Sequence, residues 1–118
     1  MNHHTEKKTI LVVDDDEILL SIAEDMLKAR YKIVIATSGN AAIDILLKGS
    51  VPDLILLDII MPDMDGWDTY KKLRGISLLK DVPVAFITSL DDKADEKAAE
   101  DLGAAGYIVK LTSVDRNI

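Results

Sequence analysis

The chain has 118 residues and a net charge of −7; 48% of its residues are hydrophobic and 30% are charged. This length accommodates one domain around a single core, and the balance of apolar and charged residues is that of a globular protein. The absence of cysteine excludes disulfides and thiolate metal sites. The acidic balance and the scattered Lys and Arg argue against direct nucleic-acid binding, because phosphate neutralisation requires clustered basic residues.

The first residues are polar and charged, and residues 1–8 are predicted to be a disordered tail that holds the only histidines, His3 and His4. This tail lacks the apolar segment of a signal peptide. No apolar run approaches the roughly 18 residues that cross a bilayer. We therefore expect a soluble cytoplasmic protein with no membrane partner.

Two strand–helix pairs are predicted in the first half of the chain. Short β-branched runs predict buried strands at Thr9–Val13 and Tyr31–Ala36. Apolar residues at helical spacing follow each strand. The first helix is predicted over Glu17–Ala29, capped by Asp15 or Asp16, with an apolar face of Ile18, Ile22, Met26 and Leu27; the second follows the turn at residues 37–40, with a face of Ala41, Ala42, Ile45 and Leu46.

Three more strands are predicted in the second half, at Asp53–Leu57, Val84–Thr88 and Ala105–Val109. Between them lie a helix marked by Trp67, Tyr70 and Leu73 that stops near Gly75, and a helix over Lys93–Asp101 that stops at Gly103. Strands separated by helices predict an α/β fold with a parallel sheet and helices on both faces. In such sheets, ligands bind at the carboxyl ends of the strands.

The residues at those strand ends are chemically unusual. The first strand ends in Asp14-Asp15-Asp16, the third in Asp58, the fourth in Thr88-Ser89 and the fifth in Lys110. Carboxylates that converge on one edge repel by roughly 4 kcal/mol per close pair at an intermediate dielectric. They therefore take up protons or recruit a cation, and oxygen ligands alone favour Mg²⁺.

A hydroxyl and an ammonium that face the same edge indicate an anion, most simply a phosphoryl group. Lys110 is placed to contact phosphate oxygens as a point charge, and Thr88 to donate a hydrogen bond to them. Asp58, at the end of the central strand, is the natural nucleophile for that phosphoryl group.

Four sequence motifs resemble the receiver domain of two-component response regulators. They are VVDDD (Val12–Asp16), LLDIIMPDMDG (Leu56–Gly66), FITS (Phe86–Ser89) and GYIVK (Gly106–Lys110). The resemblance implies a flavodoxin-like sheet with strand order 2-1-3-4-5 and assigns residues 9–118 to the receiver domain. It also implies a signalling protein rather than an enzyme, one that takes a phosphoryl group from a histidine kinase or a histidine phosphotransfer protein.

The resemblance also assigns roles to single residues. Asp58 is implied as the phosphoacceptor. Asp15 and Asp58, with the backbone carbonyl of Ile60, are implied as direct Mg²⁺ ligands, and Asp14 as a ligand through water.

Lys110 and Thr88 are implied to contact the phosphoryl oxygens, with Ser89 small enough to leave room for them. Thr88 and Tyr107 are implied to form the conformational switch. Gly66 is expected to give the loop after Asp58 its backbone freedom.

The sequence departs from the family pattern after the lysine. Leu111 stands where the family usually has a proline after a cis bond, so a trans bond is expected. Residues 111–118 are too few for a full fifth helix, which predicts that this helix is short or missing. We expect the chain to be part of a longer or altered regulator, or a second copy to cover the exposed face as a homodimer. Ile60 and Leu90, both apolar, predict slow self-dephosphorylation.

Two alternatives remain open from the sequence. The first is a pseudo-receiver, a binding module without phosphotransfer, which the Leu111 change and the shortened end leave open. The second is a phosphatase of the haloacid dehalogenase type, in which Asp14 would be the nucleophile. Its acidic pair should follow the lysine, whereas Asp91-Asp92 precedes Lys110. The aspartate labelled by acetyl phosphate distinguishes it from a receiver.

Overall fold

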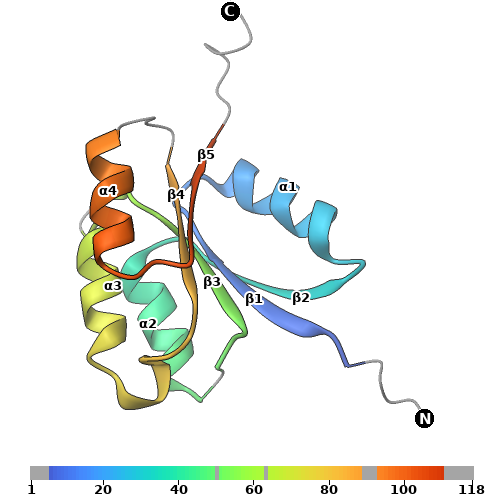
Figure 1. Cartoon of the computed structure of the whole chain (residues 1–118). Helices are drawn as coiled ribbons and strands as arrows, with labels where there is room; N and C mark the ends of the chain where they lie inside the picture. The colour runs from blue at the N-terminus through green and yellow to red at the C-terminus, as the bar shows by residue number, and fades with distance from the viewer. Residues whose placement is uncertain (1–5, 50, 63, 89–92, 111–118) are drawn as a thin grey trace, which may run out of the picture.

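The computed structural model describes residues 6–49, 51–62, 64–88 and 93–110. Its centre is a sheet of five parallel strands in the order β2-β1-β3-β4-β5. Helices cover both faces: α1 lies on one side of the sheet, and α2, α3 and α4 lie on the other (Figure 1). This is the α/β arrangement and the strand order expected for the flavodoxin-like fold.

Strands and helices alternate along the described chain. In order they are β1 (Lys8–Val13), α1 (Glu17–Leu27), β2 (Tyr31–Ala36), α2 (Gly39–Leu47), β3 (Leu54–Asp58), α3 (Gly66–Arg74), the short 3₁₀ helix η2 (Ser77–Leu79), β4 (Val84–Thr88), α4 (Lys93–Asp101) and β5 (Gly106–Val109). Each predicted strand and helix is present. Where the sequence predicted the end of an element, the observed end lies within two residues of it.

The core has two layers because side chains alternate across the sheet. Leu11 and Val13 of β1 belong to a large cluster that includes buried residues of α2, α3 and α4. Ile10 and Val12 point to the other face and pack with Leu20 of α1 in a smaller cluster. The sheet is therefore more heavily packed on the α2–α4 side than on the α1 side.

Side-chain oxygens cap three helices and fix where they begin. Asp16 accepts hydrogen bonds from the backbone N–H groups of Ile18 and Leu19 at the start of α1. Ser38 caps α2, and Asp65 caps α3 through the N–H of Asp68. Gly103 lies just after the carboxyl end of α4 and has a φ of 84°, the left-handed conformation in which glycine commonly ends a helix.

The apolar face predicted for α1 is largely exposed and not buried against the sheet. Leu20 is the buried residue of this helix, whereas Ile18, Ile22 and Met26 are 74%, 50% and 75% exposed. The period of the apolar residues is helical, as predicted, but the apolar arc is wider than the strip that meets the sheet. Part of it therefore faces outward.

Two boundary predictions also change. Lys8, placed in the disordered tail by the sequence, is the first residue of β1, because it pairs with Tyr31 of β2. The third strand, predicted at Asp53–Leu57, runs one residue later, and Asp58 is at its end as expected, paired with Ile87 of β4. The predictions for the rest of the tail, residues 1–5, and for a short or missing fifth helix in residues 111–118 lie outside the described residues.

An aromatic cluster joins α3 to the rest of the larger core. The rings of Trp67 and Tyr70 lie 4.7 and 5.4 Å from the ring of Phe86, measured between centroids. The hydroxyl of Tyr70 donates a hydrogen bond to the backbone oxygen of Leu102, just after α4, and accepts one from Arg74. These contacts hold the carboxyl end of α4 against α3.

Gly66 allows the start of α3 to contact the end of β3. Its N–H donates a 2.7 Å hydrogen bond to the backbone oxygen of Ile59. A Cβ atom at this position would lie 2.3 Å from the backbone oxygen of Asp58 and 2.8 Å from the Cα of Ile59. Among the described glycines only Gly49 and Gly103 have a positive φ. Gly66 is therefore required for close approach and not, as expected from the sequence, for backbone freedom.

We expect Gly66→Ala to destabilise the fold by about 1–3 kcal/mol, because backbone atoms must move to admit the methyl group. Urea unfolding followed by circular dichroism measures this difference. Gly75→Ala is the matched control, since a Cβ there would lie no closer than 3.4 Å to its neighbours. Equal stabilities of the two variants would contradict the close-contact explanation.

Candidate phosphoacceptor and metal site

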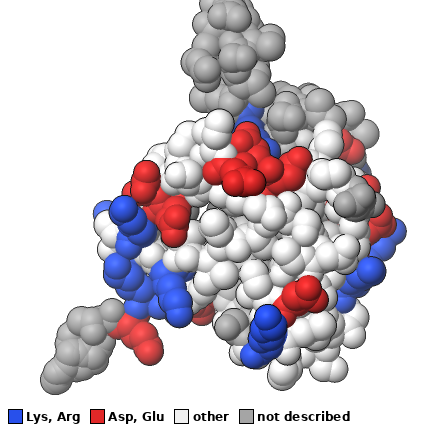
Figure 2. Space-filling view, turned by 180° about the vertical axis from the view of Figure 1, so that it is seen from behind, with Lys and Arg blue, Asp and Glu red and all other residues white. Residues whose placement is uncertain are grey.

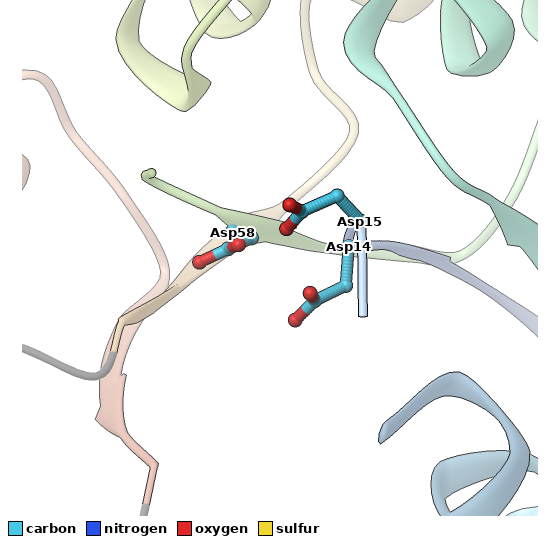
Figure 3. Close-up of side chains that lie close together, drawn as sticks. All are labelled: Asp14, Asp15 and Asp58. Carbon is cyan, nitrogen blue, oxygen red and sulfur yellow. The ribbon is translucent and has the colours of Figure 1, made fainter. Parts of the chain in front are cut away.

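Three aspartates lie together at the carboxyl edge of the sheet. Asp14 directly follows β1 and is fully buried, Asp58 ends β3 and is 3% exposed, and Asp15 is exposed. Each offers a carboxylate oxygen, and these oxygens all lie within 4.8 Å of one another. Figure 3 shows how the ends of the two strands bring the three side chains together. The sequence prediction that these residues converge is confirmed.

Lys110 directly follows the edge strand β5 and contacts the acidic cluster from there. Its Nζ lies 2.7 Å from Oδ2 of Asp14 and 3.5 Å from Oδ1 of Asp58. The backbone N–H of Lys110 donates a 2.7 Å hydrogen bond to the backbone oxygen of Thr88. This bond continues the β4–β5 pairing by one residue and places the ammonium group over the strand ends.

Asp14 is oriented by its neighbour in the chain. Its Oδ1 accepts a 2.9 Å hydrogen bond from the backbone N–H of Asp16. Its Oδ2 is buried and has no hydrogen bond of good geometry, and the charge of Lys110 at 2.7 Å compensates it. Asp16 thus has two roles, one for its backbone at the site and one for its side chain as the α1 cap. The sequence indicated only the cap.

The electrostatics of the cluster follow from burial and like charge. Burial, followed by the charges of Asp14 and Asp15, raises the pKa of Asp58 from 3.8 to about 6, although Lys110 opposes this rise. Burial lowers the pKa of Lys110, but the 2.7 Å ion pair with Asp14 and the charge of Asp58 outweigh this effect. The net result is a raised pKa for Lys110, which stays an ammonium.

The site fits a hard divalent cation. Three carboxylates and one ammonium leave a local charge of −2 when all are ionised (−3 + 1), which one divalent ion neutralises. Every side-chain ligand is an oxygen, the donor type that Mg²⁺ prefers. The buried Oδ2 of Asp14, without a hydrogen bond of its own, is a further acceptor at the same edge.

The other predicted site residues lie at or beside this edge. Thr88 ends β4 and is fully buried. Tyr107 pairs with Phe86 in the sheet and packs, half-buried, against the larger core. The Ile60 side chain, two residues after Asp58, is 51% exposed. The roles of Thr88, Tyr107 and Ile60 stay predictions. Ser89, Leu90 and Leu111 lie outside the described residues.

The charged surface reflects this clustering. Seen from behind, the molecule carries a group of acidic side chains at the upper edge, where the strands end, and a largely uncharged area beneath it (Figure 2).

The model of the response regulator receiver domain matches residues 10–117. The chain belongs to this family. It is 34% identical over 112 residues to the polar-differentiation response regulator DivK of Brucella ovis, a match that covers 94% of the chain and 90% of DivK. The family match includes the four strand ends where Asp14, Asp58, Thr88 and Lys110 lie.

Solved receiver structures agree with the fold. The N-terminal domain of a response regulator receiver protein from Methanoculleus marisnigri superimposes with a TM-score of 0.81 at 33% identity, covering 95% of the chain and 91% of that domain. The response regulator TrrA from Thermotoga maritima, solved in complex with Mg²⁺-BeF, gives 0.75 at 28% identity and covers 93% of the chain and 92% of TrrA. The family identification removes the sequence-based support for a phosphatase of the haloacid dehalogenase type.

Several curated relatives are longer than the receiver domain. The chain spans 24% of a probable cyclic di-GMP phosphodiesterase from Vibrio cholerae and 40% of the probable transcriptional regulator ycf27 of Guillardia theta, at 35% and 37% identity over 90% and 88% of the chain. Most of the length of these two relatives lies outside the region that this chain matches. Among the described residues, no helix has the length and apolarity needed to cross a bilayer.

We expect Asp58→Asn to stabilise the metal-free protein at pH 7 by up to about 3 kcal/mol. The raised pKa means that the folded protein holds the Asp58 proton more tightly than the unfolded chain, so ionisation favours unfolding as pH rises from 3.8 to about 6. The gain should largely vanish near pH 4, where Asp58 is protonated in the folded protein. Urea unfolding in EDTA at both pH values measures the difference.

Asp44→Asn, at an exposed position of α2, is the matched control and should have little effect at either pH. Added Mg²⁺ should stabilise the wild type more than Asp58→Asn, because the wild type binds the ion with one more carboxylate. A variant whose stability tracks the wild type at both pH values would contradict the electrostatic account.

Proposed function

We propose that this receiver domain accepts a phosphoryl group on Asp58 from the phosphohistidine of a histidine kinase or a histidine phosphotransfer protein. The observation that carries the proposal is the cluster of Asp14, Asp15 and Asp58 at the strand ends, with Lys110 in contact with two of them. Asp58 is a buried carboxylate that lies between two further carboxylates, which can bind a cation, and the ammonium group of Lys110. This arrangement is suited to in-line phosphoryl transfer.

The transfer uses the carboxylate of Asp58 as the nucleophile. An Asp58 oxygen forms a bond to phosphorus while the phosphorus–nitrogen bond to the donor imidazole breaks, and the imidazole nitrogen leaves with the electron pair. The product is an acyl phosphate on Asp58. Lys110, held by Asp14 at 2.7 Å, is placed to contact an oxygen of the new phosphoryl group.

Asp14, Asp15 and Asp58, together with the backbone carbonyl of Ile60, are the proposed holders of a Mg²⁺ ion. When bound, this ion supplies positive charge to the phosphoryl oxygens and neutralises the carboxylates. The Mg²⁺-BeF complex of TrrA, a relative with the same fold, supports this assignment. So does the structure of Rcp1 in an Mn²⁺-bound form, whose fold matches with a TM-score of 0.80 at 26% identity.

We propose Thr88 and Tyr107 as the switch that reports the phosphoryl group to the surface. Thr88 ends the strand next to β3, and its backbone oxygen accepts the N–H of Lys110. Tyr107 lies on the neighbouring strand β5, where it pairs with Phe86 of β4 and packs against the larger core. A new charge at Asp58 can therefore bias two adjacent strands toward a second conformation. The cytoplasmic location and the absence of direct nucleic-acid binding stay predictions.

We expect acetyl phosphate with Mg²⁺ to add one phosphoryl group to the wild type, and EDTA or Asp58→Asn to abolish it. Intact-protein mass spectrometry detects the added mass, and reduction with borohydride followed by peptide mapping locates it. Asp53→Asn, away from the strand-end cluster, is the matched control and should label normally.

Absence of labelling in a folded, Mg²⁺-binding wild type would instead favour the pseudo-receiver. Label on Asp14 would favour phosphatase-like chemistry at the first strand.

We also expect phospho-Asp58 to persist for minutes or longer. The Ile60 side chain beside the site has no polar atom to orient an attacking water, and Ile60→Asn should shorten the lifetime several-fold. ³¹P NMR of the acyl phosphate measures the decay. Ile60→Val is the matched control, because it keeps the position apolar. A wild-type lifetime of seconds would contradict this prediction.

A further inference from the structure

A pocket lies at the amino ends of β1 and β2, on the face of the sheet that α2 covers. Its volume is about 150 Å³, and the strands and the carboxyl end of α2 line it. The acidic site is at the other end of the strands: Asp14 directly follows β1, whereas the pocket contacts Thr9 and Leu11 near the start of that strand (Figure 1). The pocket is therefore separate from the phosphoacceptor site.

Two rows of cross-strand neighbours form the sheet side of the pocket. Leu11 pairs with Val34, and Thr9 pairs with Lys32, in the β1–β2 ladder. Alternate residues of a strand point to the same face, so both pairs face α2. The inner row is apolar, with Leu11 buried and Val34 half-buried, and the outer row, at the amino edge of the sheet, is polar. The pocket thus changes from apolar to polar in one direction.

Apolar side chains from outside the sheet complete the inner part of the pocket. Ile45 and the buried Leu46 line it from the end of α2, and Val51, which is 48% exposed, lines it from the segment before β3. A cavity of about 150 Å³ with apolar walls accommodates one benzene ring. The inner part therefore fits a single ring-sized apolar group.

The charges along the outer row favour an anion. Lys32 is exposed and forms no ion pair among the described residues. Asp53, on the strand at the other side of β1, is already engaged: its Oδ2 accepts a 2.7 Å hydrogen bond from the N–H of Thr9. Lys32 is therefore available to pair with a carboxylate that is attached to the apolar group in the pocket.

We propose that this pocket binds a small aromatic carboxylate, with the ring against Leu11 and Leu46 and the carboxylate at Lys32. A short aliphatic acid would leave much of the apolar volume unfilled, and a neutral ring would leave Lys32 unpaired. A ligand of about nine non-hydrogen atoms makes few contacts, so we expect a dissociation constant of about 1 mM.

An NMR titration of the ¹⁵N-labelled full chain in EDTA tests the proposal. Benzoate is the probe, benzyl alcohol is its neutral analogue, and acetate lacks the ring. Benzoate should shift the amide signals of the pocket residues saturably, with a dissociation constant of about 1 mM. Benzyl alcohol should bind about fivefold more weakly, which is the upper range for an exposed ion pair, and acetate should not saturate.

Two pairs of variants separate the charge from the cavity. Lys32→Gln should weaken benzoate binding about fivefold and leave benzyl alcohol binding unchanged. Lys72→Gln, at an exposed position on α3, is the matched control and should change neither. Val34→Phe should fill the pocket and abolish saturable binding. Ile35→Phe adds the same ring on the opposite face of β2 and should not. Circular dichroism confirms that each variant is folded.

Shifts that do not saturate, or that spread over the whole surface, would overturn the proposal. So would equal binding of benzoate to the wild type and to Lys32→Gln, a comparison that decides the matter even if Val34→Phe does not fold. Pocket signals that move when the protein alone is diluted would show that a second copy occupies the pocket, and would overturn it as well. Asp58→Asn should bind benzoate as the wild type does, so the outcome is independent of the phosphoacceptor role of Asp58.

Discussion

The mutual repulsion of three carboxylates at one edge of the sheet is the constraint on which the site depends. Asp14 and Asp58 are buried there, so water cannot screen their charges. Lys110 compensates part of this charge but not all of it. Repulsion between the carboxylates therefore destabilises the metal-free folded protein. Binding of a cation removes this repulsion, which contributes to the affinity of the site for the ion. The rest of the fold holds these groups in place: the parallel strands align them, and the caps and glycines fix the segments around them.

Most of this site could be predicted from the sequence because the fold makes strand ends meet. Once alternating strands and helices indicate a parallel sheet, the residues after each strand must share an edge, so Asp14, Asp58, Thr88 and Lys110 belong together without any knowledge of loop geometry. The orientation of Asp14 by the N–H of Asp16 could not be predicted in this way. It depends on a turn of two residues, for which the sequence offers only a run of aspartates.

The errors have a common physical origin, since a sequence pattern describes one element and not its neighbours. Apolar spacing identified α1 correctly, but it could not say that Leu20 meets the sheet while Ile18 and Ile22 face outward. Gly66 was interpreted through its own torsion angles, whereas its necessity comes from the backbone of Asp58 and Ile59 beside it. Both are properties of packing between segments, and packing becomes visible only when the segments are assembled.

The aromatic cluster has a practical consequence for solution work. Trp67 is the single tryptophan of the chain; it follows Gly66 directly and lies against Phe86, two residues before the end of β4 at Thr88. It therefore lies between the loop that follows Asp58 and the strand that ends in Thr88. Its indole ring is an intrinsic fluorophore at the junction between the site and the core. Rearrangement of either segment can be followed optically in the unmodified protein, without an attached dye.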